Sequence, residues 1–150
     1  MPSIKTLNDR VDALNYSVEE LILFFKQQIN FQQYVYPKWT MKDVLGHLTF
    51  WHESFASNVE DLYHERKPCP LSGKLSEVNK RSVESNRNTS ISTLIKRLKT
   101  AQNSLKKHIH CKHIDMIPYK KGSRDYSKEE HLELVQHHIQ KHLKDLKTAV

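Results

Sequence analysis

An unbroken apolar period runs through residues 4–29, IKTLNDRVDALNYSVEELILFFKQQI. Its apolar side chains recur by alternating steps of three and four residues, at Ile4, Leu7, Val11, Leu14, Val18, Leu21 and Phe25. This spacing places them along one face of an α-helix, as in a helix that packs into a bundle. Ser17 and Glu20 have the spacing of a capping box, which would begin a second helix. We expect one long helix instead, because the period crosses Ser17 without a change of phase.

Three further segments carry the same apolar pattern, and each follows a helix-capping signal. Thr40 with Asp43 and Ser127 with Glu130 are spaced as capping boxes, and Ser90 precedes another apolar period. We expect the helices that follow these caps to end near residues 66, 146 and 109, respectively.

The connections between the four predicted helices differ in length and character. Residues 28–39 form an irregular, aromatic-rich connection, and residues 118–126 read as a loop. Residues 68–89 are polar, with a short helix expected from Ser76, and they are too long for a helical hairpin loop. The sequence therefore predicts an all-α fold, a four-helix bundle with a crossover connection between its second and third helices.

The composition agrees with a small helical protein. A length of 150 residues suits one domain, so we expect residues 1–150 to form a single domain, and three glycines leave few turns for a β fold. No apolar run approaches the roughly 18 residues of a membrane span, and the start lacks the apolar core of a signal peptide. Cys69 and Cys111 make neither a disulfide framework nor a metal-ligand spacing. We expect a cytoplasmic protein.

Ten histidines are the unusual feature of this chain. His138 and His142 are four residues apart, which puts two imidazoles on one helix face about 6 Å apart along the axis, a spacing that can chelate a divalent metal ion. On a helical wheel, His47 is the best placed third ligand. Three protein ligands leave coordination positions open, as in catalytic metal sites. In a chain with ten histidines such a pair can also arise by chance, so its spacing alone leaves open whether it binds a metal. His52 lies near the centre of its apolar stripe, and we expect it to be a hydrogen-bonded core histidine.

The segment WTMKDVLGHLTFWHE, Trp39–Glu53, resembles the opening of the second helix in the DinB-like superfamily, also described as YfiT-like metalloenzymes. The family pattern is a tryptophan, a hydroxyl cap, an acidic residue and an H-L pair, and these places are filled by Trp39, Thr40, Asp43, His47 and Leu48. HIQKH, residues 138–142, stands where the family has H-x-x-x-H in its last helix. The resemblance implies a four-helix bundle with a crossover, in which His47, His138 and His142 bind the metal.

Within this superfamily the chain is most similar to the ClbS/DfsB branch, which shares the W-T-x-K-D-V-x-x-H-L opening. Metal-binding members of the superfamily include thiol-cofactor transferases and a maleylpyruvate isomerase. The ClbS-type protein is a hydrolase that protects against a DNA-damaging electrophile and is not known as a histidine–metal enzyme. His142 is followed by Leu143-Lys144-Asp145 and not by the common R-G-Q ending, so the resemblance does not carry over a substrate.

The sequence and the resemblance together predict an enzyme that acts on a small electrophilic molecule, by hydrolysis or thiol transfer, with a divalent metal held by three histidines. Such an ion lowers the pKa of a bound water or thiol. Zinc is the default for an all-imidazole site and nickel is the alternative; thiol transfer would require a low-molecular-weight thiol. The alternatives are a metal-free ClbS-like protective hydrolase and a protein that binds or sequesters a small molecule without turnover.

Four further residues are candidates for a substrate pocket. Trp51 lies one turn beyond the second-helix histidine, Arg124 and Tyr126 lie in the loop before the last helix, and His131 lies two turns before the histidine pair. Arg124 could hold a substrate carboxylate or phosphate, or could pair with an acid at the surface. Trp51 fits the core as well as it fits a pocket wall.

The net charge of +7 does not by itself indicate a nucleic-acid partner. The lysines of residues 90–114 lie opposite the apolar stripe, as on a solvated helix face. No aromatic residues alternate with them to stack on bases, and there is no helix-turn-helix or zinc-finger pattern. We expect a small-molecule substrate, no specific nucleic acid and no membrane partner, with homodimerisation left open.

Overall fold

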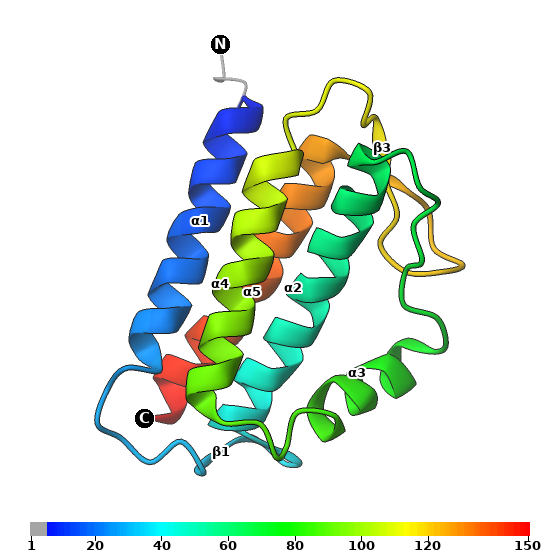
Figure 1. Cartoon of the computed structure of the whole chain (residues 1–150). Coiled ribbons are helices and arrows are strands. Elements are labelled where there is room, and N and C mark those ends of the chain that lie inside the picture. Colours follow the sequence, from blue (N-terminus) through cyan, green and yellow to red (C-terminus); the bar gives the residue numbers. More distant parts are fainter. Residues whose placement is uncertain (1–5) are drawn as a thin grey trace.

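The computed structural model describes residues 6–150, which fold into four long helices and one shorter helix (Figure 1). The helices are α1 (Leu7–Phe24), α2 (Met41–Tyr63), α3 (Leu75–Glu84), α4 (Ile91–His108) and α5 (Lys128–Ala149). The four long helices form a bundle, and α3 packs on its outside against α2. The predicted all-α bundle is confirmed, although Ile4, where the predicted first period begins, lies outside the described residues.

The helix directions require a long connection in the middle of the chain. Helices α2 and α4 run in the same direction and pack against each other, whereas α1 and α5 form a second pair that runs the opposite way (Figure 1). Because two parallel neighbours cannot be joined by a short hairpin, residues 64–90 return along the outside of the bundle and include α3. The predicted crossover between the second and third long helices is confirmed.

The predicted caps start the helices through the expected hydrogen bonds. The Thr40 side chain accepts from the backbone N–H of Asp43, whose carboxylate accepts from the backbone N–H of Thr40. Ser127 and Glu130 form the same reciprocal pair at α5, and Ser90 caps α4. These local bonds satisfy backbone donors that have no partner within a helix.

Helix α1 passes through Ser17 as one helix, as predicted. Its buried Ser17 hydroxyl accepts a hydrogen bond of 2.7 Å from Nε2 of Gln140 and so ties α1 to α5. The helix ends at Phe24, earlier than the end of the apolar segment at residue 29. The chain turns there, and the rings of Phe25 and Phe31 pack with centroids 5.0 Å apart.

Two short hairpins replace stretches that the sequence left irregular. Strand β1 (Tyr34–Tyr36) pairs with β2 (Trp39–Thr40), and β3 (Met116–Ile117) pairs with β4 (Tyr126–Ser127), both antiparallel. Each hairpin leads directly into the cap of a long helix. The first one also contacts α5, which brings its aromatic side chains to the histidines of that helix.

A glycine allows the end of the crossover segment to approach α2 closely. A Cβ atom on Gly46 would lie only 3.0 Å from Cβ of Asn86, which follows α3. The Asn86 side chain donates a hydrogen bond of 3.0 Å to the Gly46 carbonyl. This contact sits one residue before His47, and it holds α3 where Ser82 reaches the His47 ring.

The centre of the bundle is filled by apolar side chains of all four long helices, among them Leu14, Leu21, Leu45, Leu48, Leu94, Leu98, Val135 and Ile139. His52 is buried there, with its Nε2 2.8 Å from Oε1 of Gln102, which confirms the predicted core histidine. Within residues 6–150, none of the helices has the length and apolarity needed to cross a membrane.

Candidate metal centre

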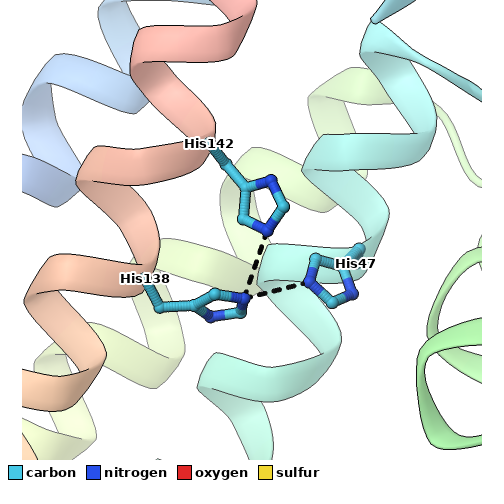
Figure 2. A group of neighbouring side chains, drawn as sticks. All are labelled: His47, His138 and His142. Carbon is cyan, nitrogen blue, oxygen red and sulfur yellow. Dashed lines mark hydrogen bonds between the residues drawn. The ribbon is translucent and has the colours of Figure 1, made fainter. Parts of the chain in front are cut away.

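Three imidazoles from two helices meet at one side of the bundle (Figure 2). His47 comes from the second turn of α2, and His138 and His142 come from successive turns of α5. Nε2 of His138 lies 3.2 Å from Nε2 of His47 and 3.2 Å from Nε2 of His142. One ring nitrogen of each residue lies within 4.8 Å of the other two. The structure thus brings together the three histidines that the sequence singled out.

The spacing of these nitrogens suits a single metal ion. Two imidazole nitrogens bound at about 2.0–2.1 Å to one tetrahedral zinc ion lie about 3.3–3.4 Å apart. The observed separations of 3.2 Å come close to this value. With all three ligand nitrogens within 4.8 Å of one another, the residues could hold one metal ion.

A hydrogen-bond chain fixes which nitrogen of His47 carries the proton. The Ser82 hydroxyl donates to the backbone carbonyl of Asn79 at 2.5 Å. Its oxygen, 2.8 Å from Nδ1 of His47, therefore accepts a hydrogen bond from that nitrogen. With the proton on Nδ1, Nε2 presents its lone pair to the other two histidines, as a metal ligand must.

The same arrangement holds His142. The Tyr36 hydroxyl donates to Oδ2 of Asp145 at 2.5 Å, and its oxygen lies 2.8 Å from Nδ1 of His142. Burial, followed by the hydrogen bond to Asp145, raises the pKa of Tyr36 well above its ordinary value of 10, so the phenol keeps its proton. Tyr36 therefore accepts from Nδ1–H of His142, which leaves Nε2 free for a ligand bond.

The three rings are neutral at physiological pH. Burial is the largest cause that lowers the pKa of each ring, to about 2 for His47 and to about 4 for His138 and His142. The nearby Lys141 ammonium lowers all three further, and His142 lowers the pKa of both other rings. Neutral imidazole is the form that binds metal ions.

An open cleft of about 520 Å³ gives access to the three imidazoles. Its lining consists of Tyr36, Pro37, Lys38, Trp39, His47, Asn79, His138, Lys141 and His142. The Trp39 ring lies with its centroid 4.7 Å from that of His47 and is stacked on His142 at 6.4 Å. A small molecule in the cleft would therefore contact both the Trp39 indole and the imidazole rings that line the cleft.

Trp51, a predicted pocket residue, lies behind the cleft wall. Its side chain is 1% exposed and stacks on Tyr119 with ring centroids 5.2 Å apart. Its indole N–H donates a hydrogen bond of 3.0 Å to Oδ1 of Asn79. Trp51 thus supports a lining residue of the cleft without lining it itself.

The other three predicted pocket residues lie away from this cleft. Arg124 pairs with Glu130 at 3.1 Å and stacks over the Tyr126 ring at 3.9 Å, which is the surface pairing considered as its alternative. His131 is fully buried, in edge contact with Phe55 at 4.9 Å between ring centroids. None of them lines the cleft beside the three histidines, and their part in substrate binding stays a prediction.

Sequence reasoning missed Tyr36 and Ser82 as partners of the histidines. Tyr36 was part of an aromatic connection with no expected structure, and Ser82 was one hydroxyl in a short polar helix. Asp145 was quoted only as a departure from the family ending. Its position one turn after His142 was the available signal, because residues three apart on a helix lie side by side.

Comparisons with known proteins identify the fold. No family model matches the sequence, and no curated protein matches it significantly. The structure is similar to the crystal structure of a mycothiol-dependent maleylpyruvate isomerase, with a TM-score of 0.74 and 11% sequence identity. The match covers 95% of this chain but 61% of that protein. At this identity the likeness establishes a shared helical fold, and the chain spans less than two thirds of the isomerase.

Proposed function

We propose that this protein is a metal-dependent enzyme that acts on a small electrophilic molecule, by thiol transfer or by hydrolysis. The observation that carries the proposal is the cluster of three neutral imidazoles, in which Nε2 of His138 lies about one ligand spacing from Nε2 of each of the other two. Two of these rings are fixed in the ligating tautomer by hydrogen bonds to Nδ1. Such outer hydrogen bonds are typical of histidines that bind metals.

The donor set fits a divalent transition metal. Imidazole nitrogens suit zinc and nickel, and we take zinc as the first candidate. Three protein ligands leave positions open toward the cleft, which is the arrangement of catalytic and not of structural zinc sites. When bound, the ion supplies Lewis acidity, which lowers the pKa of a water or thiol that reaches it.

The residues around the histidines position them and shape the reaction space. Ser82 holds the His47 ring, Tyr36 holds the His142 ring, and Trp39 forms a flat wall beside both. Neither Cys69 nor Cys111 lines the cleft. The attacking group is therefore not a protein thiol, and we take it to be a water molecule or a small thiol.

Two likenesses bear on the choice of chemistry, and the structural one favours thiol transfer. The motifs that contain His47 and the pair 138–142 resemble the DinB-like superfamily, with the ClbS/DfsB branch as the most similar. The fold is that of an isomerase described as mycothiol-dependent. We therefore place thiol transfer ahead of hydrolysis, with a low-molecular-weight thiol as co-substrate.

The test begins with the metal content of tag-free protein, measured by mass spectrometry after incubation with zinc or nickel. We expect near-stoichiometric metal in the wild type and its loss in His47→Ala and His138→Ala. His137→Ala is the matched control, because His137 is the exposed neighbour in α5 and lies outside the cluster. A wild type that holds no metal would refute the proposal, and the metal-free ClbS-like hydrolase or the small-molecule binding protein would then lead.

Activity provides the second half of the test. Metal-loaded and chelator-treated protein are compared with chlorodinitrobenzene and cysteine as electrophile and thiol, and with nitrophenyl acetate for hydrolysis. We expect turnover that requires both the metal and His138. Bound metal without faster turnover of any electrophile would leave a metal-holding binding protein, contrary to the proposal.

A further inference from the structure

The cleft beside the three histidines is lined by positive and not by negative side chains. Lys38 lies in the turn between β1 and β2, and Lys141 lies on α5 between the two ligating histidines. Both are exposed, and the lining contains no aspartate or glutamate. Among residues 6–150, neither ammonium takes part in an ion pair, whereas Lys147 further along α5 pairs with Glu20.

The carboxylate of Asp145, which borders this region, offsets at most one of the two lysine charges. Its Oδ2 accepts the short hydrogen bond from Tyr36, and the residue is not part of the cleft lining. Lys141 lines the same cleft as all three imidazoles. A divalent ion on the histidines would make the cleft more positive still.

Apart from the three histidines, the remaining polar groups of the lining are hydrogen-bond donors. The Trp51 indole can only donate, so the Asn79 side chain must turn its oxygen toward Trp51. The amide NH₂ of Asn79 is then the group left for a ligand. The Trp39 indole can also only donate, and the Tyr36 hydroxyl already donates to Asp145 and accepts from His142.

We propose that the molecule which enters this cleft is a small organic anion. Its carboxylate lies between Lys38, Lys141 and the Asn79 amide, and its apolar or planar part packs on the Trp39 ring. Apart from the three imidazoles, the lining offers donors and positive charge and no free side-chain acceptor. By complementarity, it favours a ligand that offers acceptors and negative charge. As an assignment of substrate class, this inference rests on the proposed function, although anion binding itself does not require turnover.

The experiment compares benzoate with benzamide, which has the same ring and nearly the same shape without the charge. Binding is measured by calorimetry to zinc-loaded and to chelator-treated protein, at low and at high salt. We expect benzoate to bind both forms at least about tenfold more tightly than benzamide, and to weaken as salt screens the lysines. Trp39→Phe should weaken both ligands to a similar extent, because the indole contacts the shared ring.

Lysine variants locate the site. Lys38→Ala and Lys141→Ala should each weaken the binding of benzoate about three- to tenfold and leave the binding of benzamide unchanged. Lys144→Ala removes the same charge from an exposed position of α5 outside the cleft, and it should leave benzoate unchanged. An equal loss in Lys144→Ala and Lys141→Ala would mean that only net charge matters, and it would overturn the inference.

Two further outcomes separate this inference from the proposed function. Zinc binding and turnover of neutral electrophiles, with no preference for benzoate, would overturn the inference and leave the metalloenzyme intact. Benzoate binding that depends on both lysines in a protein that takes up no metal would support the anion site while the proposed function fails. Benzoate binding that requires zinc and ignores both lysines would overturn the inference, because the anion would then be a direct metal ligand.

Discussion

The Tyr36 hydroxyl provides the sharpest test of the reasoning about the metal centre, because one oxygen joins a carboxylate to a ligand histidine. Tyr36→Phe removes that oxygen and keeps the ring, whose contacts with Trp39 and His142 are edge-to-face with centroids 5.9 and 5.8 Å apart. The variant should therefore fold normally. What it loses is the acceptor 2.8 Å from Nδ1 of His142.

The size of the effect follows from what this acceptor does. Without it, the His142 ring is free to place its proton on either nitrogen and to rotate, so part of the population no longer presents Nε2 to the metal. Loss of such an outer hydrogen bond typically costs about 10–100-fold in metal affinity, which corresponds to about 1.4–2.7 kcal/mol. Ser82→Ala should have a comparable effect through His47, because it leaves Nδ1–H of a buried ring without its partner at 2.8 Å.

The assay is a zinc competition titration against a chromophoric chelator at pH 7, on tag-free protein. Tyr34→Phe is the matched control: Tyr34 belongs to the same strand, is 65% exposed and lies outside the cleft. We expect the control to bind zinc as the wild type does. A zinc affinity of Tyr36→Phe within twofold of that of the wild type would show that the hydroxyl does not orient the His142 ring, and it would refute the assignment of its tautomer.

A double-mutant cycle with Asp145→Ala extends this test. Asp145 hydrogen-bonds to Tyr36 and to none of the imidazoles, although its charge also raises the pKa of His142. Most of its effect on zinc affinity should therefore pass through the phenol. We therefore expect Asp145→Ala to weaken zinc binding in the wild type and to have little further effect in Tyr36→Phe. Additive losses would mean that the carboxylate acts on the ion through space.

Three other outcomes follow from the structure. Metal-free protein should lose stability as the pH falls from 6.5 to 4, because burial lowers the pKa of His52 and of His131 to about 4, whereas both side chains have their ordinary pKa of 6.5 in the unfolded chain. Over that range, each of the two rings should lower the free energy of unfolding by about 3 kcal/mol. Equal free energies of unfolding in urea at pH 7 and pH 4 would contradict this. Gly46→Ala should lower the melting temperature by several degrees, because the new Cβ atom would lie 3.0 Å from Cβ of Asn86. An unchanged melting temperature in calorimetry would show that Asn86 and α3 move away from the new side chain at no cost in stability. Zinc in excess should raise the melting temperature of the wild type and not of His138→Ala, as measured by differential scanning fluorimetry.

The fold was predictable because its signals are local. Each long helix carries an apolar period that no competing pattern interrupts, and caps such as Thr40 with Asp43 mark the starts. The crossover followed from the length of one connection. The two hairpins were not predictable in the same way, because β1 and β2 contain five residues in all, Tyr34–Tyr36 and Trp39–Thr40. Strands this short show no alternation, and they form where β1 packs on α5 and β2 packs on α2.

The candidate ligands were predictable for the same reason, and the placement of the pocket residues was not. His138 and His142 share a helix face by spacing alone, and His47 lies at a matching angle on its own helix. The helical wheel gives the face of α5 on which a side chain lies, but it does not give how deeply that side chain is buried. His131 is in line with the pair but two turns earlier in α5, and its ring is fully buried there.

The groups that give the three imidazoles their chemistry come from distant parts of the chain. Tyr36 stands 106 residues from His142, and Ser82 stands 35 residues from His47. No periodic pattern links such positions, since each pairing depends on the first hairpin packing on α5 or on α3 docking at Gly46. A motif of three histidines therefore identifies the candidate ligands, whereas their tautomers depend on tertiary contacts. For this reason Tyr36→Phe and Ser82→Ala, and not further histidine variants, test whether contacts outside the cluster hold the imidazoles in the form that binds a metal ion.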